Sequence, residues 1–276
     1  MTLFLRWAAS LAIFLLLPGL CLAQAPPVET HSVLPETIEH RLRRFSRSNW
    51  TREAELRRIF EEAGCSGSRL SEQRVADGNP PNVACRLPGR TDATIIVGAH
   101  SDLRGGGQGV LDNWSGAALL PSLFQSLGGA APRHTFIFVG FSAEEHHRKG
   151  SKFYMKNLSP QEAVHIRAMV NLDCLGAGSA AVWTHHADPK LLSALYDAAR
   201  ESSSSLRNVD LVLMYDDAMS FRKHGIPTLS LHSLTRESVH ALHSRRDNLS
   251  VIDLDSYYAS YRLIAAYLVH LDSALE

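Results

Sequence analysis

The sequence has no excess of charge of either sign: among its 276 residues, 28 Lys and Arg balance 28 Asp and Glu. A balanced chain offers no electrostatic attraction to nucleic acid or to an anionic membrane, so we expect neither as a partner. The sequence also contains no internal repeat and no low-complexity linker. With about 250 residues left once a short N-terminal segment is set aside, these absences favour one folded domain.

Long apolar runs are absent after the first 23 residues, where no stretch approaches the roughly 18 apolar residues that a membrane-spanning helix requires. Met1–Ala23 has the pattern of a secretory signal, in which Arg6 precedes an apolar segment and cleavage follows Ala23. An uncleaved N-terminal anchor is the alternative. We expect a secreted or periplasmic protein, monomeric and free of the membrane after cleavage, with a flexible lead-in over residues 24–35.

Cysteine is scarce, and no CxxC pair is present, so the sequence gives no support for a thiolate metal site. Cys21 would leave with the signal. Cys65 and Cys85 either pair in an oxidising compartment or both stay reduced, and the sequence leaves these alternatives open. We expect Cys174 to be a buried free thiol.

Short apolar runs of the kind found in buried parallel strands alternate with helix-favouring segments. The strand candidates are Val83–Leu87, Thr94–Ala99, His134–Phe141, Ile166–Asp173, Ala180–Thr184, Val209–Met214 and Ile226–Leu231. The main helix candidates are Asp112–Leu127, Lys149–Leu158, Asp188–Ser202, Ala218–His224 and Asp253–Leu275. This alternation predicts an α/β fold with helices on both faces of a sheet.

We expect a single domain over residues 36–276, in which residues 36–82 form an N-terminal helical segment packed on the rest. Within it, Glu36–Ala63 has apolar residues at helical spacing and predicts two amphipathic helices. We expect the Arg-rich faces of these helices to be exposed to solvent.

Imidazoles and carboxylates follow several of the apolar runs, at the points where the predicted strands end. They are His100 and Asp102, then Glu144 and Glu145, then Asp173, and finally His232 followed by His243. In open α/β sheets the ligand site lies beyond the carboxyl ends of the strands. These side chains therefore predict one shared site.

Five of the candidates suit a pair of divalent cations: His100, Asp112, Glu145, Asp173 and His243. A mixed set of imidazoles and carboxylates is typical of zinc. Two cations about 3.5–4 Å apart need a bridging carboxylate, and Asp112 is the natural bridge. One zinc would then bind His100 and Asp173, and the other would bind Glu145 and His243.

Glu144 and Asp102 have supporting roles in this hypothesis. Glu144 faces the metal-bound water, accepts its proton and returns it to a leaving amine, so hydrolysis is the predicted reaction. Asp102 accepts the free N–H of the His100 imidazole and fixes its tautomer. Taken singly, these residues also have structural explanations, such as a solvated acidic pair or a helix N-cap for Asp112; only the whole set favours a site.

Five short motifs in this order resemble one known family. They are Gly98–Asp102 (G-x-H-x-D), Leu111–Gly116 (D-[DN]-x-S-G), Phe141–Glu145 with Lys149–Ser151 (F-x-x-E-E…G-S), Asn171–Asp173 (N-x-D) and Leu242–Asn248 (H-[TS]-x-x-D). The chain from about Val83 onward resembles the co-catalytic dizinc aminopeptidases related to secreted bacterial leucine aminopeptidases. That family also contains glutamate carboxypeptidases and glutaminyl cyclases.

The resemblance implies a mixed, mainly parallel sheet of about eight strands between helices. It implies the same five metal ligands, with Glu144 as general base, in an aminopeptidase that acts on peptides with a free N-terminus. Tyr215–Phe221 matches the segment that borders the family's substrate pocket, so Asp217 is a candidate to meet the substrate's amino group, or else a helix cap. His146 is a candidate to line the pocket.

Two departures from the family pattern stand out. His146-His147-Arg148 after Glu145 predicts a pocket rim that is more basic and polar than in many relatives. Arg104-Gly105-Gly106-Gly107 predicts an unusually flexible loop before the bridging Asp112.

Two other functions remain open from the sequence. A glutaminyl cyclase-like acyltransferase would hold a single zinc and would not need a complete second site, but His100 and the setting of Asp112 favour the peptidase. A binding module that kept the fold and lost the chemistry would not require all five ligands together with Glu144.

Overall fold

The computed structural model describes residues 31–275 apart from residues 77, 130 and 211–214. The expected signal Met1–Ala23 and most of the expected lead-in lie outside these residues. The end of the expected strand Val209–Met214 lies outside them as well. Secretion therefore stays a prediction.

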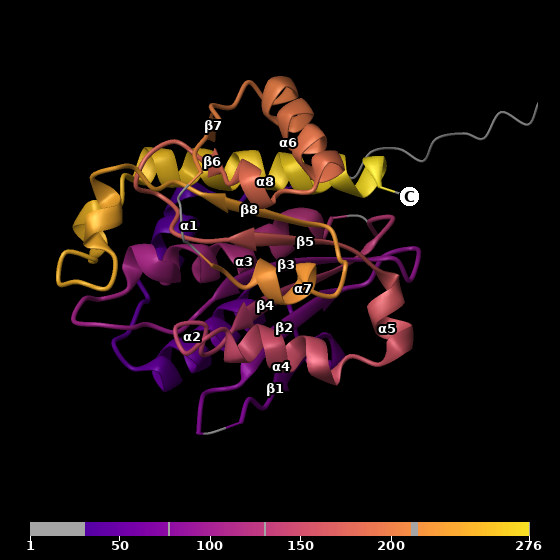
Figure 1. Cartoon of the computed structure of the whole chain (residues 1–276), viewed down its shortest axis with the longest axis horizontal. Helices are drawn as coiled ribbons and strands as arrows, with labels where there is room; N and C mark the ends of the chain where they lie inside the picture. Colours follow the sequence, from indigo (N-terminus) through magenta and orange to yellow (C-terminus); the bar gives the residue numbers. More distant parts are fainter. Residues whose placement is uncertain (1–30, 77, 130, 211–214, 276) are drawn as a thin grey trace, which may run out of the picture.

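One mixed sheet runs through the described part of the chain, with its strands in the order β1-β2-β4-β3-β5-β8-β6-β7 (Figure 1). Its strands are β1 Leu70–Gln73, β2 Asn82–Leu87, β3 Thr94–His100, β4 Thr135–Phe141, β5 Ile166–Leu172, β6 Ala181–Val182, β7 Arg207–Asn208 and β8 Thr228–His232. The central strands β4, β3, β5 and β8 are parallel to one another. The pairs β1–β2, β2–β4 and β6–β8 are antiparallel. The α/β prediction of a mixed, mainly parallel sheet of about eight strands is confirmed.

Helices cover both faces of the sheet because successive side chains of a strand point to opposite faces. On β3, Ile95 and Val97 belong to the core of one face, whereas Ile96 belongs to the core of the other. The helices are α1 Pro35–Leu42, α2 Asn49–Glu62, α3 Ser115–Leu127, α4 Lys149–Asn157, α5 Pro160–His165, α6 Pro189–Glu201, α7 Ala218–Arg222 and α8 Leu254–Ala274. Side chains of α1, α2, α3, α6 and α8 pack in the first core, and those of α4 and α7 pack in the second.

Some elements differ from the sequence-based expectation. Strand β1 has no buried residue and lies at the edge of the sheet, paired with β2 alone, so it carries no apolar pattern that could predict it. The short helix α5 also buries none of its side chains. The strand expected over Ala180–Thr184 is shorter, because Thr184–His186 forms a 3-10 turn.

The prediction that the Arg-rich faces of the N-terminal helices are solvated is wrong for two arginines. Arg41 is 5% exposed and Arg52 is fully buried. The Arg41 guanidinium donates to the Ser122 hydroxyl (2.8 Å) and to the Gln125 side-chain carbonyl (2.8 Å), both on α3. A buried guanidinium is stable when acceptors of this kind meet its N–H groups, and here they dock the N-terminal helices on α3.

The two cysteines whose pairing the sequence left open form a disulfide. Cys65 follows α2 and Cys85 lies on β2, so the bond fastens the end of α2 to the sheet. Cys174 is a buried free thiol, as predicted. The disulfide agrees with an oxidising compartment.

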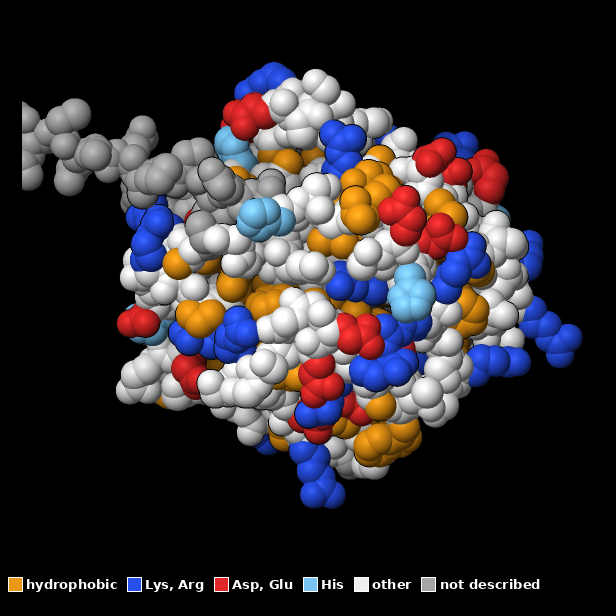
Figure 2. Space-filling model, turned by 180° about the vertical axis from the view of Figure 1, so that it is seen from behind, with side chains coloured by type: hydrophobic (Ala, Val, Ile, Leu, Met, Phe, Trp, Pro, Cys, Tyr) orange, Lys and Arg blue, Asp and Glu red, His pale blue; other side chains and the backbone are white. Residues whose placement is uncertain are grey.

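Basic, acidic and apolar side chains are interspersed on the surface seen from behind in Figure 2. This mixture matches the balanced composition of the chain. Among the described residues, no helix combines the length and the apolar character needed to cross a membrane.

One carboxylate near the C-terminus attaches α8 to the start of β4. Asp272 on α8 accepts hydrogen bonds from the backbone N–H of Arg133 (2.8 Å) and of His134 (2.7 Å). Its Oδ1 is also 3.1 Å from Nδ1 of the buried His134 imidazole. Burial opposes ionisation of Asp272, but these bonds outweigh it and lower the pKa of the carboxyl below its usual value.

We expect Asp272→Asn to lower the free energy of unfolding near neutral pH by about 2 kcal/mol, because charge-assisted hydrogen bonds from two backbone N–H groups are lost. A lowered folded-state pKa gives stability that is present above the ordinary carboxyl pKa and is lost as the pH falls through the folded-state value. The difference between the two proteins should therefore persist at neutral pH and shrink in acid. Denaturant unfolding of both proteins, at neutral pH and in acid, measures this difference in the free energy of unfolding.

Asp255→Asn is the matched control, because Asp255 is exposed in the first turn of the same helix. Its loss should cost only a few tenths of a kcal/mol through the helix dipole. Equal losses in the two variants would contradict the docking role of Asp272.

Candidate metal centre

The predicted site residues come from neighbouring strands of the parallel part of the sheet. Strand β3 ends in His100, and its two neighbours β4 and β5 lead into Glu144–Glu145 and Asp173. His243 follows β8 and lies before α8. The carboxyl ends of parallel strands meet at one edge, which is why these side chains converge.

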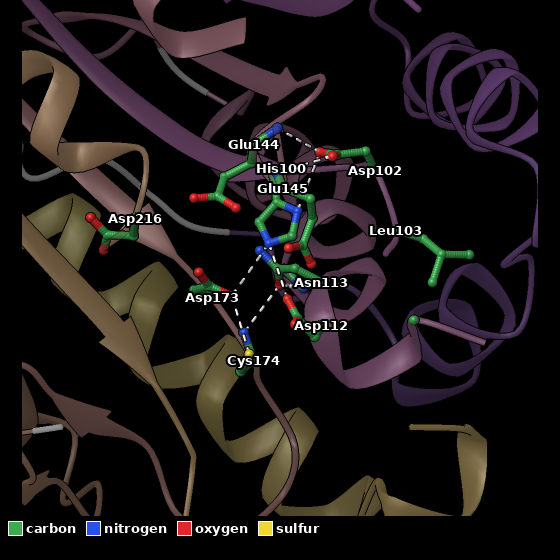
Figure 3. Close-up of polar contacts among 12 residues, drawn as sticks. His100, Asp102, Leu103, Asp112, Asn113, Glu144, Glu145, Asp173, Cys174 and Asp216 are labelled. Carbon is green, nitrogen blue, oxygen red and sulfur yellow. Dashed lines mark hydrogen bonds and ion pairs between the residues drawn. The ribbon is translucent and has the colours of Figure 1, made fainter. Parts of the chain in front are cut away.

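Asp112 lies beside the His100 imidazole (Figure 3) and also faces His243. Its Oδ1 is 3.2 Å from Nε2 of His100, and its Oδ2 is 3.1 Å from Nε2 of His243. An oxygen of Asp173 lies 3.7 Å from the same nitrogen of His100. An oxygen of Glu145 lies 2.9 Å from the same nitrogen of His243. The five side chains thus form two groups that share Asp112.

The donor atoms of each group could hold a divalent cation. In the group of His100, Asp112 and Asp173, and in the group of Asp112, Glu145 and His243, the ligand atoms lie within 4.8 Å of one another. Imidazole nitrogen and carboxylate oxygen are ligands that zinc accepts. A carboxylate with one oxygen toward each group can offset the mutual repulsion of two cations.

Asp247 fixes the backbone that leads into Asp112. It accepts hydrogen bonds from the N–H of Leu111 (2.8 Å) and from the N–H of Asp112 (3.1 Å). Asp112 has extended dihedral angles, φ −115° and ψ 92°, and α3 begins only at Ser115. The prediction that the helix starts at Asp112 is therefore wrong, because the backbone of Asp112 and Asn113 is not helical.

Asn113 links this segment to the end of β5. Its side-chain N–H donates to the carbonyl of Leu172 (2.8 Å), and its Oδ1 accepts from the N–H of Cys174 (3.1 Å). These two backbone groups flank Asp173. One side chain therefore holds Asp112 and Asp173 in a fixed relation.

The glycine-rich loop before Asp112 packs closely against the segment that carries His243. A Cβ on Gly105 would lie 2.5 Å from the carbonyl oxygen of His243, and one on Gly107 would lie 2.3 Å from that of Ser244. Gly105 also has φ +89°, which favours glycine. The sequence suggested flexibility here, but the structure gives these glycines a packing role.

Arg52 on α2 holds both ends of the same loop. Its buried guanidinium donates to the carbonyl of Ser101, to that of Gln108 (3.2 Å) and to that of Gly109 (2.9 Å). It also lies over the ring of Trp114, 5.2 Å from the centroid. Burial lowers the pKa of Arg52 to about 10, against the effect of nearby carboxylates, so the group stays charged at neutral pH.

Asp102 connects His100 with the acidic pair after β4 (Figure 3). One of its oxygens is 3.4 Å from Nδ1 of His100. The same carboxylate accepts hydrogen bonds from the N–H of Glu144 (2.9 Å) and of Glu145 (3.2 Å). Asp102 therefore positions groups on two adjacent strands.

Two further carboxyl groups of the site have raised pKa values. Burial raises the pKa of Glu144 to about 9; His100 opposes this shift, and the carboxylates of Asp217 and Asp173 add to it. Burial likewise raises the pKa of Asp217 to about 7. A divalent cation beside these carboxyls would lower both values.

A small hollow of about 20 Å³ opens beside Asp173. Its walls are mostly apolar, with Asp173 and Asp216 as the acidic members. The lining residues are Asp173, Cys174, Trp183, Tyr215, Asp216, Ser230, Leu231, His232 and Leu234. An apolar lining next to the two groups around Asp112 is typical of a pocket that selects apolar side chains.

The two remaining predicted residues differ in burial: Asp217 is buried, whereas His146 is exposed. Asp217 is 1% exposed, precedes α7 and makes no side-chain cap. Neither of its carboxylate oxygens has a hydrogen-bond partner among the described residues. His146 is exposed and does not line the hollow beside Asp173. The roles of both stay predictions.

Sequence reasoning missed Arg52, Asp247 and Asn113 as positioning residues. Asp247 and Asn113 stood inside motifs that were recognised, and their hydrogen bonds could not be read from the letters. Arg52 had no signal, since an arginine on an amphipathic helix is usually exposed.

Comparisons with known proteins agree with this fold. The sequence profile of Peptidase family M28 matches residues 82–268. A curated relative, an aminopeptidase of Pseudomonas aeruginosa, is 36% identical over 100 residues; these are 36% of this chain, which spans only 17% of the length of that relative. Both structures compared below show the fold alone.

The first is BSAP, described as a zinc aminopeptidase from Bacillus subtilis. It superposes with a TM-score of 0.64 and 20% identity, over 71% of this chain and 53% of that chain. The second is a glutaminyl cyclase of an Acidobacteriales bacterium, with a TM-score of 0.74 and 19% identity, over 91% of this chain and 99% of that chain.

We expect Arg52→Lys to loosen the loop between His100 and Asp112, because lysine cannot donate to all of the carbonyls that the guanidinium reaches. Losing buried hydrogen bonds from a charged donor should lower the free energy of unfolding by about 3 kcal/mol. Amide hydrogen exchange over residues 101–112 should become faster.

The control is Arg57→Lys, on the same helix, where the guanidinium is 45% exposed and pairs with Glu61 and Glu72. It should leave exchange in the loop unchanged. If Arg52→Lys also left that exchange unchanged, the loop would not depend on Arg52.

Proposed function

The chain belongs to Peptidase family M28, and from this membership we propose that it is a zinc-dependent aminopeptidase that releases the N-terminal residue of peptides. The observation that carries the proposal is the geometry of Asp112, whose two oxygens face His100 and His243 at 3.2 and 3.1 Å. A single carboxylate between two imidazoles suits a bridge between two cations. The zinc aminopeptidase of B. subtilis that shares the fold supports the choice of metal.

Two zinc ions would be held by the five converging side chains. His100 and Asp173 would hold one ion, Glu145 and His243 would hold the other, and Asp112 would be shared. When bound, zinc supplies Lewis acidity that lowers the pKa of water and polarises a peptide carbonyl.

Glu144 would act as the general base and acid of the reaction. Its carboxylate would take a proton from the attacking water and return it to the nitrogen of the leaving peptide. The hydrogen bond from the Glu144 N–H to Asp102 fixes the backbone from which this side chain extends. Asp102 would also hold the tautomer of His100, from 3.4 Å.

The free N-terminus of the substrate would be recognised by acidic groups next to these residues. Asp217 is a buried carboxyl next to Ser151 and Glu144, and its carboxylate would meet the ammonium group. The hollow beside Asp173 would take the first side chain. Its apolar walls of Trp183, Leu231 and Leu234 favour an apolar residue over an acidic one.

Export is part of the proposal. The Cys65–Cys85 disulfide supports an oxidising compartment, and Met1–Ala23 has the sequence pattern of a secretory signal. We propose that the protein acts outside the cytoplasm.

We expect the protein to hydrolyse aminoacyl chromogenic derivatives, apolar ones fastest, and to lose this activity with a chelator until zinc is added. Asp112→Ala should lower the zinc content from about two per chain toward zero, because both sites share this ligand. Elemental analysis and a substrate panel measure both effects. A protein inactive on the whole panel in the presence of zinc would count against the proposal.

Glu144→Gln keeps the shape of the side chain and removes the base. We expect kcat to fall by about 10²–10⁴-fold while the zinc content stays at two. Full activity of Glu144→Gln would contradict its role. It would also reopen the alternative of a binding module without catalysis, if ligand binding were all that remained.

A glutaminyl cyclase-like acyltransferase is the second candidate, favoured by a fold match that spans 99% of the cyclase chain. The cyclase would hold one zinc and release ammonia from peptides that begin with Gln. Mass spectrometry of such a peptide, together with the zinc content, separates the two. One zinc with loss of ammonia favours the cyclase, whereas two zincs with release of the first residue favour the aminopeptidase.

A further inference from the structure

A second hollow, of about 210 Å³, lies between α4 and α7, which pack side by side (Figure 1). We call it the basic groove. One wall carries Arg148, Lys152 and Lys156, and the other carries Lys223 and His224 after α7. No carboxylate lines it.

The segments that form the basic groove contain no acidic residue that could balance its positive charge. Residues 148–161 and 218–236 contain no Asp or Glu, although the whole chain carries equal numbers of acidic and basic residues. Lys152, Lys156 and Lys223 are exposed. No ion pair of these three lysines is recorded within the part of the chain that the structure describes.

The helix dipole favours Lys156, in the last turn of α4, but it does not account for Lys152. Lys152 lies at the end of the first turn, where the positive end of the helix dipole disfavours a cation, and no acidic residue is present there. Lys152 and Lys156 are four residues apart, at a spacing where like charges repel. An anion between the two walls would relieve both effects.

Both walls of the basic groove lead outward from the candidate metal centre. Arg148 follows Glu145 by three residues, and its N–H donates to the carbonyl of Glu144 (2.6 Å). Ser220 follows Asp217 by three residues, and its hydroxyl is 2.8 Å from that of Ser151 on α4. The groove therefore begins about one turn from the site on each side.

A cation–π contact connects the basic groove with the hollow beside Asp173. The Arg148 guanidinium lies over the ring of Tyr215, 5.6 Å from the centroid. Tyr215 lines that hollow, and Arg148 lines the groove. A chain that leaves the hollow can pass this pair and enter the groove.

From this arrangement we propose that the basic groove binds acidic residues of the peptide substrate, downstream of the residue that is released. The inference rests on the proposed aminopeptidase function and narrows its substrates to peptides with an acidic stretch after the N-terminus. Lysine ammonium groups on flexible stems bind carboxylates without a strict geometry, so the position of the acidic residues can vary. The groups are exposed, so the attraction depends strongly on salt.

The test compares peptides of about ten residues, long enough to span about 35 Å when extended. All share the best N-terminal residue of the chromogenic panel. One carries two adjacent Asp residues, moved stepwise along the chain, and the reference peptide carries Asn in their place. At low salt we expect kcat/KM for the best acidic peptide to exceed that of the reference by about tenfold, since exposed ion pairs are individually weak and several act together.

The variant Lys152→Glu/Lys156→Glu should abolish or reverse this preference, and salt near 1 M, where the Debye length is about 3 Å, should remove it. Glu is a good helix former, and the gain from the helix dipole at position 152 offsets the loss at position 156 in the last turn, so α4 should stay folded. Hydrolysis of the short chromogenic substrate, which does not reach α4, should be unchanged. The matched control is Lys190→Glu, an equal charge change at an exposed position on α6, which should keep the preference.

Equal cleavage of acidic and neutral peptides by a protein that hydrolyses the chromogenic substrate would overturn this inference and leave the aminopeptidase intact. A protein that hydrolyses neither would overturn the aminopeptidase first, and the inference with it. If Lys152→Glu/Lys156→Glu instead lowered binding to vesicles of anionic lipid and left the peptide preference unchanged, the groove would serve a membrane surface and the inference would be wrong.

Discussion

The two carboxylate oxygens of Asp112 face two imidazoles from different parts of the chain. The rest of the site depends on this position of Asp112 between His100 and His243. His100 comes from the end of β3, and His243 comes from the loop between β8 and α8. A second carboxylate lies near each imidazole. Asp173 is 3.7 Å from Nε2 of His100, and Glu145 is 2.9 Å from Nε2 of His243. The parallel order of β4, β3 and β5 delivers three of these groups to one edge of the sheet, so the fold determines where metal chemistry can occur.

Much of the remaining structure keeps Asp112 in place. Asp247 binds the backbone N–H groups of Leu111 and Asp112, and Asn113 ties Asp112 to the residues that flank Asp173. Arg52 closes the loop from the side of α2, outside the segment that the family profile matches. The N-terminal helices therefore contribute to the candidate centre although they carry none of the predicted ligands. A buried guanidinium without acceptors would cost free energy. Once its N–H groups are bound by backbone carbonyls, it favours one arrangement of the loop.

The surface next to the centre divides into two regions of different chemistry. The hollow beside Asp173 is mostly apolar and suits a single side chain, whereas the basic groove carries an uncompensated positive charge. Tyr215 and Arg148 lie between them and contribute one side chain to each. In a substrate that occupies both regions, the hollow would favour an apolar first residue, and the basic groove would favour acidic residues farther along the peptide. The sequence suggested a more basic rim from Arg148 and its neighbours, but only the packing of α4 against α7 brings Lys223 to the same groove.

The sequence by itself determined the α/β class, the central strands and the five converging ligand candidates, because apolar runs of strand length that end in imidazoles or carboxylates leave few other arrangements. It could not reveal β1, whose pairing depends on the backbone of β2 rather than on an apolar pattern. Nor could it show whether Cys65 and Cys85 pair, since the distance between them depends on how α2 packs on the sheet. Only the tertiary structure decided that Arg52 is a buried clamp and that the glycines before Asp112 are packing positions. These roles arise from contacts between segments that lie far apart in the chain, and a local pattern carries no information about such contacts.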